Sequence, residues 1–78
     1  MSSIHLVFSD QGLKQCLYRA DTDEPIVLLG AAVCHPDRDI YLVMEAECAA
    51  HGLECSNGID HPELVRLMVD HSPIVSWP

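Results

Sequence analysis

The sequence predicts an α/β domain built in three layers around a mainly parallel sheet of about five short strands. Short apolar runs alternate along the chain with segments in which apolar residues recur at helical spacing. This alternation is typical of parallel strands joined by right-handed crossovers. The run at residues 26–29 is apolar at every position, as expected for a strand covered on both faces. With 78 residues there is room for one small domain, over residues 1–78.

The first strand and the first helix have clear local signals. Residues 4–8 are mostly aliphatic and aromatic, which favours a strand. Ser9 can then cap a helix by accepting a backbone N–H hydrogen bond. Behind it, apolar residues recur at helical spacing at Leu13, Cys16, Leu17 and Ala20. Residues 21–25 are polar and end in proline, so we expect a loop there.

The middle of the chain leaves little room for a second crossover helix. Residues 30–39 can hold about one helical turn, before a third strand at residues 40–44. A short alanine-rich helix at residues 45–51 ends at Gly52, and residues 53–59 are predicted to form a weak strand. Because the second helix is so reduced, we expect one sheet face to be thinly covered. Apolar surface left in this way commonly meets a partner.

The last helix and the last strand are also well marked. Asp60 is placed to cap the helix, with Pro62 in its first turn and Glu63 at the capping-box position. Residues 74–77 close the fold as a strand. The helix has a wider apolar stripe than one sheet face requires, at Leu64, Val65, Leu67, Met68 and Val69. Since tryptophan is also enriched among interface anchors, we predict that the protein associates with itself or with related subunits. The predicted interface residues are Leu64, Leu67, Met68, His71 and Trp77.

The acidic composition disfavours direct binding to nucleic acids or anionic membranes. Twelve acidic residues against four basic ones give a net charge of −8. The basic residues are scattered singly, whereas a phosphate-binding surface needs them clustered. The sequence does not open with a secretory signal, and no apolar run reaches the ~18–20 residues that span a bilayer. We therefore expect a soluble, cytoplasmic protein.

Isolated polar residues near the strands have structural interpretations. We expect His5, inside the first strand, to be a core or edge histidine whose ring is hydrogen-bonded within the protein. His71 is expected to cap the last helix, where a cation favours the helix dipole. Asp21, Asp23 and Glu24 are interpreted as loop residues in contact with solvent.

The four cysteines are expected to be thiols, since disulfides are rare in the cytoplasm. Cys16 is the candidate for sulfur chemistry, because persulfide transfer needs a thiolate. Its position in the helical stripe beside Leu13 and Leu17 instead directs it to the core, where a free cysteine behaves as a small hydrophobe. We therefore predict that Cys16 faces the sheet and reacts slowly with alkylating agents.

A second cysteine pattern has zinc-like spacing. It consists of Cys48-x-x-His51-x-x-x-Cys55, with Cys34 available as a fourth ligand. A structural metal would stabilise so small a domain. Against a metal site, Cys48 and His51 lie on a predicted helix, and no second compact ligand pair accompanies them. We expect no metal and no cofactor, and keep a small zinc-stapled binding module as an alternative.

Short motifs at both ends of the chain resemble one protein family. The first strand has a histidine after an aliphatic residue, in Ser3-Ile4-His5-Leu6-Val7, and the first helix carries Cys16 within residues 13–20. The chain finishes with Asp60, the helical segment at residues 64–71 that ends on His71, and Val75-Ser76-Trp77. These motifs are similar to those of the TusB/DsrH family of sulfur-relay subunits. Residues 28–33 depart from that family, whose members carry an acidic residue, a Gly-Val pair and a longer helix there.

The resemblance implies a flavodoxin-like subunit of a cytoplasmic heterohexamer of the TusBCD or DsrEFH type. Its partners would be TusC- and TusD-type or DsrE- and DsrF-type subunits, and the TusD/DsrE subunit carries the main sulfur-bearing cysteine. Sulfur passes on to a TusE/DsrC-type carrier. It ends in tRNA 2-thiouridine at the wobble position in one branch and serves dissimilatory sulfur oxidation in the other. The leading interpretation is a non-catalytic, partner-binding subunit. The enzyme alternative is an independent thiol sulfurtransferase that uses Cys16.

Overall fold

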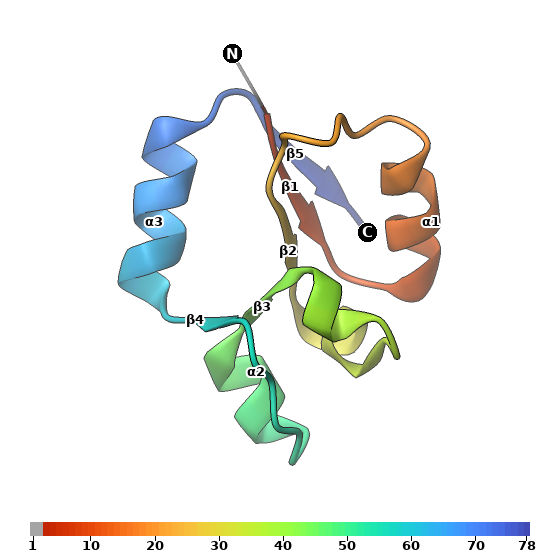
Figure 1. The fold of residues 1–78 in the computed structure, drawn as a ribbon, viewed down its shortest axis with the longest axis vertical. Helices are drawn as coiled ribbons and strands as arrows, with labels where there is room; N and C mark the ends of the chain where they lie inside the picture. Colours follow the sequence, from red (N-terminus) through yellow and green to blue (C-terminus); the bar gives the residue numbers. More distant parts are fainter. Residues whose placement is uncertain (1–2) are drawn as a thin grey trace.

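The structure, a computed structural model, describes residues 3–78 (Figure 1). The strands are β1 (Ile4–Val7), β2 (Ile26–Leu28), β3 (Leu42–Met44), β4 (Gly58–Ile59) and β5 (Ile74–Trp77). The α-helices are α1 (Asp10–Leu17), α2 (Glu45–Ala50) and α3 (His61–Asp70). Two 3₁₀ helices, η1 (Gly30–Cys34) and η2 (Arg38–Ile40), connect β2 to β3. None of the helices described over residues 3–78 is long and apolar enough to cross a membrane.

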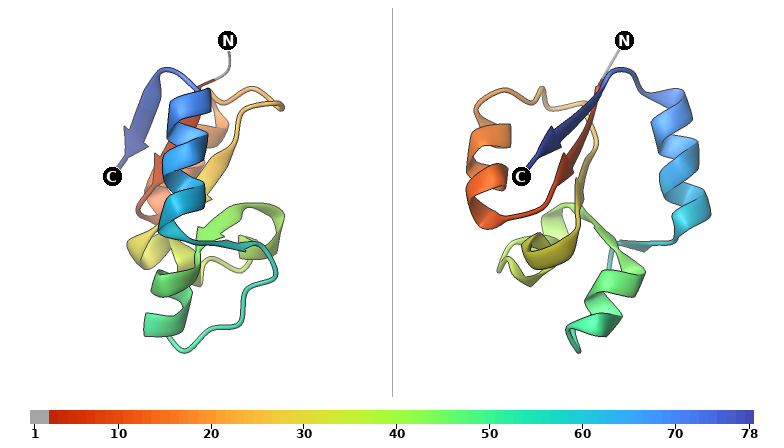
Figure 2. Two further views of the ribbon diagram at one scale, coloured as in Figure 1. Left: turned by 90° about the vertical axis from the view of Figure 1, so that its left-hand side faces the viewer. Right: turned by 180° about the vertical axis from the view of Figure 1, so that it is seen from behind.

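Within the described residues the strands form one five-stranded sheet of order β4-β3-β2-β1-β5, and every neighbouring pair is parallel. The predicted α/β class with a parallel sheet is therefore confirmed. One buried cluster joins the sheet to α1, η1 and α2, and a second joins the opposite face to α3. Figures 1 and 2 show the resulting three layers, with α3 on one side of the strands and α1 on the other. This arrangement is compatible with a small flavodoxin-like fold.

The predicted helix caps are confirmed. The N–H of Gly12 donates to Ser9 Oγ at 3.0 Å, so that α1 begins at the next residue after Ser9. The N–H of Glu63 donates to Asp60 Oδ1 at 2.9 Å at the start of α3. Each bond satisfies one of the N–H groups that a first helical turn leaves without a partner.

The predicted shortage of helix between the second and third strands is also confirmed, since η1 and η2 replace it. The third strand starts at Leu42 rather than at residue 40, because Ile40 belongs to η2. Coverage of the two sheet faces is unequal. α3 alone covers one face, and of its residues Leu64 is buried, whereas α1 buries Gly12, Leu13 and Cys16.

The weak strand expected at residues 53–59 is wrong over most of its length, because β4 consists of Gly58–Ile59 alone. Two features hold the preceding residues away from the sheet. Cys55 is joined by a disulfide to Cys48 in α2, where the chain reverses at Gly52 with φ +67°. Ser56 Oγ also donates to Asp39 Oδ1 at 3.0 Å. The expectation that all four cysteines are thiols is therefore wrong for Cys48 and Cys55.

The register of the strands is stepped. Ile26, the first residue of β2, pairs with His5, the second residue of β1. In the same way Leu42 pairs with Val27, and Gly58 pairs with Val43. Each strand from β2 to β4 therefore begins one residue later than its neighbour, and the amino ends of the strands recede toward the β4 edge.

Candidate functional site

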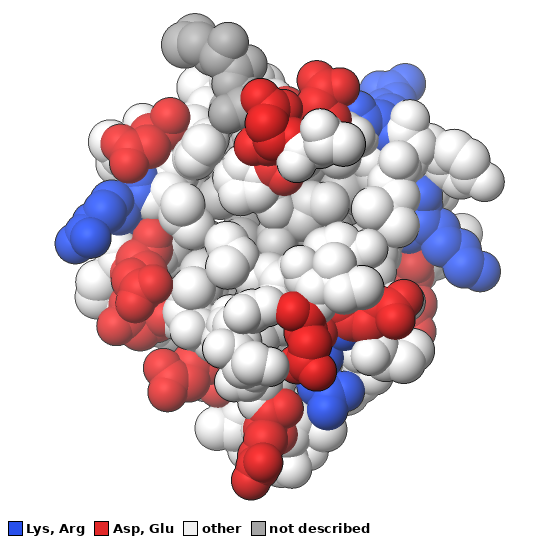
Figure 3. All heavy atoms as spheres, in the orientation of Figure 1, with Lys and Arg blue, Asp and Glu red and all other residues white. Residues whose placement is uncertain are grey.

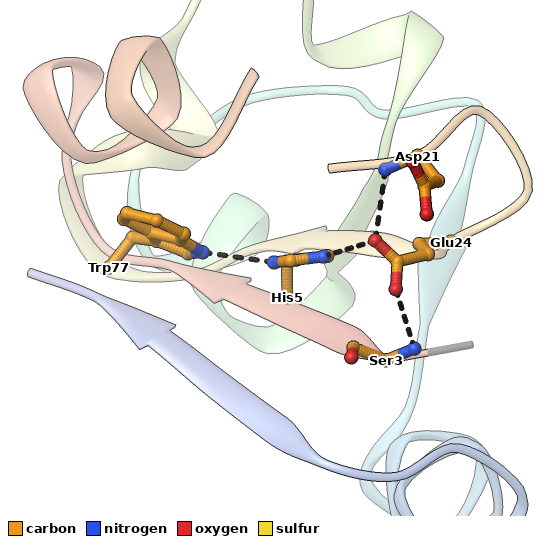
Figure 4. Close-up of polar contacts among 5 residues, drawn as sticks. All are labelled: Ser3, His5, Asp21, Glu24 and Trp77. Carbon is orange, nitrogen blue, oxygen red and sulfur yellow. Dashed lines mark hydrogen bonds and ion pairs between the residues drawn. The ribbon is translucent and has the colours of Figure 1, made fainter. Parts of the chain in front are cut away.

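The polar cluster nearest the sheet centre is built around His5 of β1 (Figure 4). The indole Nε1–H of Trp77, in β5, points to His5 Nδ1 at 3.0 Å. On the other side of the ring, His5 Nε2 lies 2.9 Å from Oε1 of Glu24, in the loop before β2. His5 is 4% exposed, so these contacts are shielded from water.

The partners of His5 fix its tautomer. An indole nitrogen can only donate, so Nδ1 of His5 accepts, and the hydrogen of the neutral ring is on Nε2. Nε2 then donates to the Glu24 carboxylate. The rings of His5 and Trp77 are stacked, with centroids 6.1 Å apart and planes 29° apart. Because both ring nitrogens are used inside the protein, His5 positions Trp77 and Glu24, and the expectation of a satisfied core histidine is confirmed.

The Glu24 carboxylate accepts hydrogen bonds from three residues. Besides His5, the N–H of Asp21 donates to Oε1 at 2.9 Å and the N–H of Ser3 donates to Oε2 at 2.7 Å. These contacts, led by the Asp21 N–H, lower the pKa of the Glu24 carboxyl to about 2. Glu24 is therefore an anion at neutral pH that ties the loop to β1. The interpretation of Glu24 as a solvated loop acid is wrong.

The C-terminal end of β5 reaches the site because α1 leaves room for it. A Cβ at Gly12 would lie 2.6 Å from the Trp77 carbonyl oxygen, so only glycine fits this contact. The same carbonyl accepts the N–H of Phe8 at 3.0 Å, directly after β1. Trp77 is thus held by its backbone as well as by its side chain, and it packs at the margin of the α1 core.

Cys16 lies on the buried face of α1, in the core, and is fully buried. It belongs to the cluster that contains Leu13 and Leu28, so the prediction that Cys16 faces the sheet is confirmed. Burial, and then the negative charge of Glu24, raise the pKa of the Cys16 thiol to about 11. The thiolate that attacks sulfur is therefore scarce at pH 7.

Most of the predicted interface residues are partly or fully buried within the protein itself. Leu64 is buried against the sheet, and Leu67 and Met68 are half-buried beside the same cluster. Trp77 is half-buried and bonded to His5. The N–H of His71, which follows α3, donates to the Leu67 carbonyl at 3.0 Å. The apolar side chains that α3 presents to solvent are instead Val65 and Val69.

The other cysteines do not gather around a common point. Cys48 and Cys55 are bonded to each other, which uses two of the three thiolates that the zinc alternative requires. Cys34 is an exposed free thiol at the end of η1. Among residues 3–78, no three His, Cys, Asp or Glu side chains are placed to hold a metal ion.

Comparisons with protein-family models, with curated proteins and with solved structures give no match. Two residues that carry the resemblance to the TusB/DsrH family nevertheless contact each other, although 72 positions separate them in the sequence. His5 from the first motif and Trp77 from the last form the hydrogen bond described above. The residue that the sequence did not single out is Glu24, whose neighbours in sequence give no sign of a histidine 19 positions away.

Proposed function

We propose that this chain is a non-catalytic, partner-binding subunit of a cytoplasmic sulfur-relay complex of the TusBCD or DsrEFH type. The motifs at both ends of the chain support the family. The contact between His5 and Trp77 supports a structural use of these motifs, because both ring nitrogens of His5 are occupied by the protein itself. The observation that carries the non-catalytic role is the state of Cys16.

Persulfide transfer begins when a thiolate attacks the terminal sulfur of a persulfide. A new S–S bond forms to that sulfur, the old S–S bond breaks, and the donor cysteine leaves as a thiolate. Cys16 is poorly suited to either side of this exchange. It is fully buried, and the pKa of its thiol is raised to about 11, so the nucleophile is scarce and has no access to a partner persulfide.

In this proposal the sulfur is carried by a related TusD- or DsrE-type subunit and passes to a TusE- or DsrC-type carrier. The sulfur then ends in a tRNA uridine or serves dissimilatory sulfur oxidation. The net charge of −8 supports a subunit that does not itself contact tRNA. This chain contributes surface that holds the partner subunits in place.

The test is isolation of the protein from native cells, followed by treatment of the isolated assembly with inorganic polysulfide as the sulfane-sulfur donor. We expect related subunits to co-purify, and mass spectrometry to find the added sulfur on a partner cysteine rather than on Cys16. Cys16→Ser should leave sulfur transfer by the assembly intact, and Cys34→Ser is the control for an exposed thiol. Added sulfur on Cys16, or the absence of any related subunit, would contradict the proposal.

A further inference from the structure

Two hollows open on either side of the amino end of β3. The first, of about 480 Å³, lies between the loop after α1 and the segment before β3, and it includes Leu17, Ile26, Ile40 and Tyr41 among its walls. The second, of about 500 Å³, lies between β4 and the first turns of α3, and it includes Ile59, Pro62 and Leu67. Leu42, the first residue of β3, lines both. We call the two hollows together the amino-end groove.

The stepped register explains why the groove exists. Because β3 begins opposite the second residue of β2, Ile26 has no residue of β3 beside it. Because β4 begins opposite the second residue of β3, Leu42 in turn has no residue of β4 beside it. The strand pairing stops at these residues, and the two hollows lie at the amino ends of β3 and β4.

The groove leaves apolar side chains exposed that the fold itself does not use. Ile40 is 72% exposed and Leu17 is 50% exposed, and both line the hollow on the α1 side. Apolar surface gathered around a concave edge in this way marks an interaction site more often than isolated exposed residues do.

The rim of the groove is acidic. Asp21 and Glu24 line the first hollow, and Asp60 and Glu63 line the second, where Arg66 is the one basic residue. Figure 3 shows this face of the molecule, with uncharged surface across its centre, acidic groups above it, below it and to the left, and basic groups toward the left and right edges. The exposed carboxylates of Asp21, Asp60 and Glu63, against one guanidinium, make the groove attractive to a cation.

We infer that the amino-end groove binds a short basic segment of a partner protein, whose apolar side chains enter the two hollows on either side of Leu42 and whose Lys or Arg side chains meet the acidic rim. This inference rests on the partner-binding role proposed above and specifies its surface. A second copy of this chain is a poor occupant, since it brings another −8 of charge and only four basic residues. Two hollows that share only Leu42 suit an extended peptide segment better than a compact small molecule.

The test uses fluorescein-labelled twelve-residue peptides and fluorescence polarisation with the full chain. The probe peptide alternates leucine and lysine, one control peptide replaces every leucine by serine, and another replaces every lysine by glutamate. We expect the leucine–lysine peptide to bind and both control peptides to bind at least about tenfold more weakly, because the apolar and the charged contacts are both required.

Matched protein variants locate the binding. Ile40→Ser should weaken binding by about fivefold, whereas Val69→Ser, at a valine 77% exposed on α3 outside the groove, should leave it unchanged. Glu63→Gln should weaken binding and reduce its dependence on salt, whereas Glu54→Gln, at an exposed acid away from the groove, should not. Because Ile40 and Glu63 are exposed, these variants are expected to fold, and circular dichroism checks this.

Failure of the leucine–lysine peptide to bind would overturn the inference. Equal binding of the serine control, or equal effects of the groove and non-groove variants, would also overturn it, since either result indicates unspecific attraction to an acidic protein. The peptide-binding test uses no sulfur-relay protein other than this chain. The outcome is therefore separate from that of the co-purification test, and each proposal can fail without the other.

Discussion

The hydrogen bond between Trp77 and His5 can be tested by removing one donor atom. Trp77→Phe keeps an aromatic ring over His5 but deletes the indole N–H that points to Nδ1. Since His5 is 4% exposed, water cannot replace this donor, and a buried acceptor is left without a partner. A buried polar atom in this state costs about 1–3 kcal/mol of folding free energy. For a domain of this size each kcal/mol lowers Tm by roughly 4–8 °C.

The assay is urea unfolding followed by far-ultraviolet circular dichroism, because the substitution removes the one tryptophan of the sequence and with it the usual fluorescence signal. A phenylalanine also buries less surface than a tryptophan, so the single variant mixes two effects. A double-mutant cycle with His5→Phe separates them. The packing lost at Trp77 is the same whether position 5 is His or Phe, so it cancels in the cycle. The coupling free energy that remains is that of the pair.

We expect a coupling free energy of about 1 kcal/mol between positions 5 and 77, favouring the native pair. The double variant should therefore be more stable than the sum of the two single effects predicts. A coupling within about 0.3 kcal/mol of zero would refute the reasoning. It would mean that Trp77 is held by packing and by its backbone contacts alone, and that the tautomer of His5 does not depend on it.

Three further predictions concern the other ionisable and sulfur-bearing groups. Iodoacetamide at pH 7 should modify Cys34 quickly and the buried Cys16 slowly in the same folded sample, as read by peptide mass spectrometry; Cys16→Ser should cost about 1–3 kcal/mol of stability. The depressed pKa of Glu24 means that its stabilising contribution is present above about pH 4.5 and is lost as the pH falls toward 2. Tm measured across this range should therefore fall less for Glu24→Gln than for the unmodified protein. Reduction of the disulfide between Cys48 and Cys55, seven positions apart, should lower stability by about 2–3 kcal/mol, and the variant with alanine at both positions should not respond to the reductant.

The sequence predicts best those features that depend on near neighbours. Ser9 and Asp60 cap helices through N–H groups three positions away, so their roles can be seen in a few consecutive residues. Helical spacing also predicts the burial of Leu13 and Cys16, although Leu17, in the same predicted stripe, is half-exposed.

Features that depend on distant residues are harder to predict. Glu24 resembles its acidic neighbours in the loop, and only the pairing of β1 with β2 brings it to His5. The sequence predicts a weak strand over residues 53–59, but the bond from Cys55 to Cys48 holds residues 53–57 near α2. Trp77 is predicted as an interface residue, and only the pairing of β5 with β1 brings its indole to His5. For Glu24 and Trp77 the deciding partner lies 19 and 72 positions away, beyond the reach of local spacing, and for Cys55 it is a covalent bond that spacing does not reveal.

The strand order also has a consequence for how the chain folds. Pairings along β1, β2, β3 and β4 join strands that are consecutive in sequence, whereas β5 must return past all of them to pair Ile74 with Ile4. Closing that longer loop costs about 1 kcal/mol more in chain entropy than closing the loop from β1 to β2. We therefore expect the pairing of β5 with β1 to form late. Because Trp77 lies on β5 and is the one tryptophan of the sequence, its fluorescence reports the docking of the last strand, while circular dichroism reports the helices that form before it.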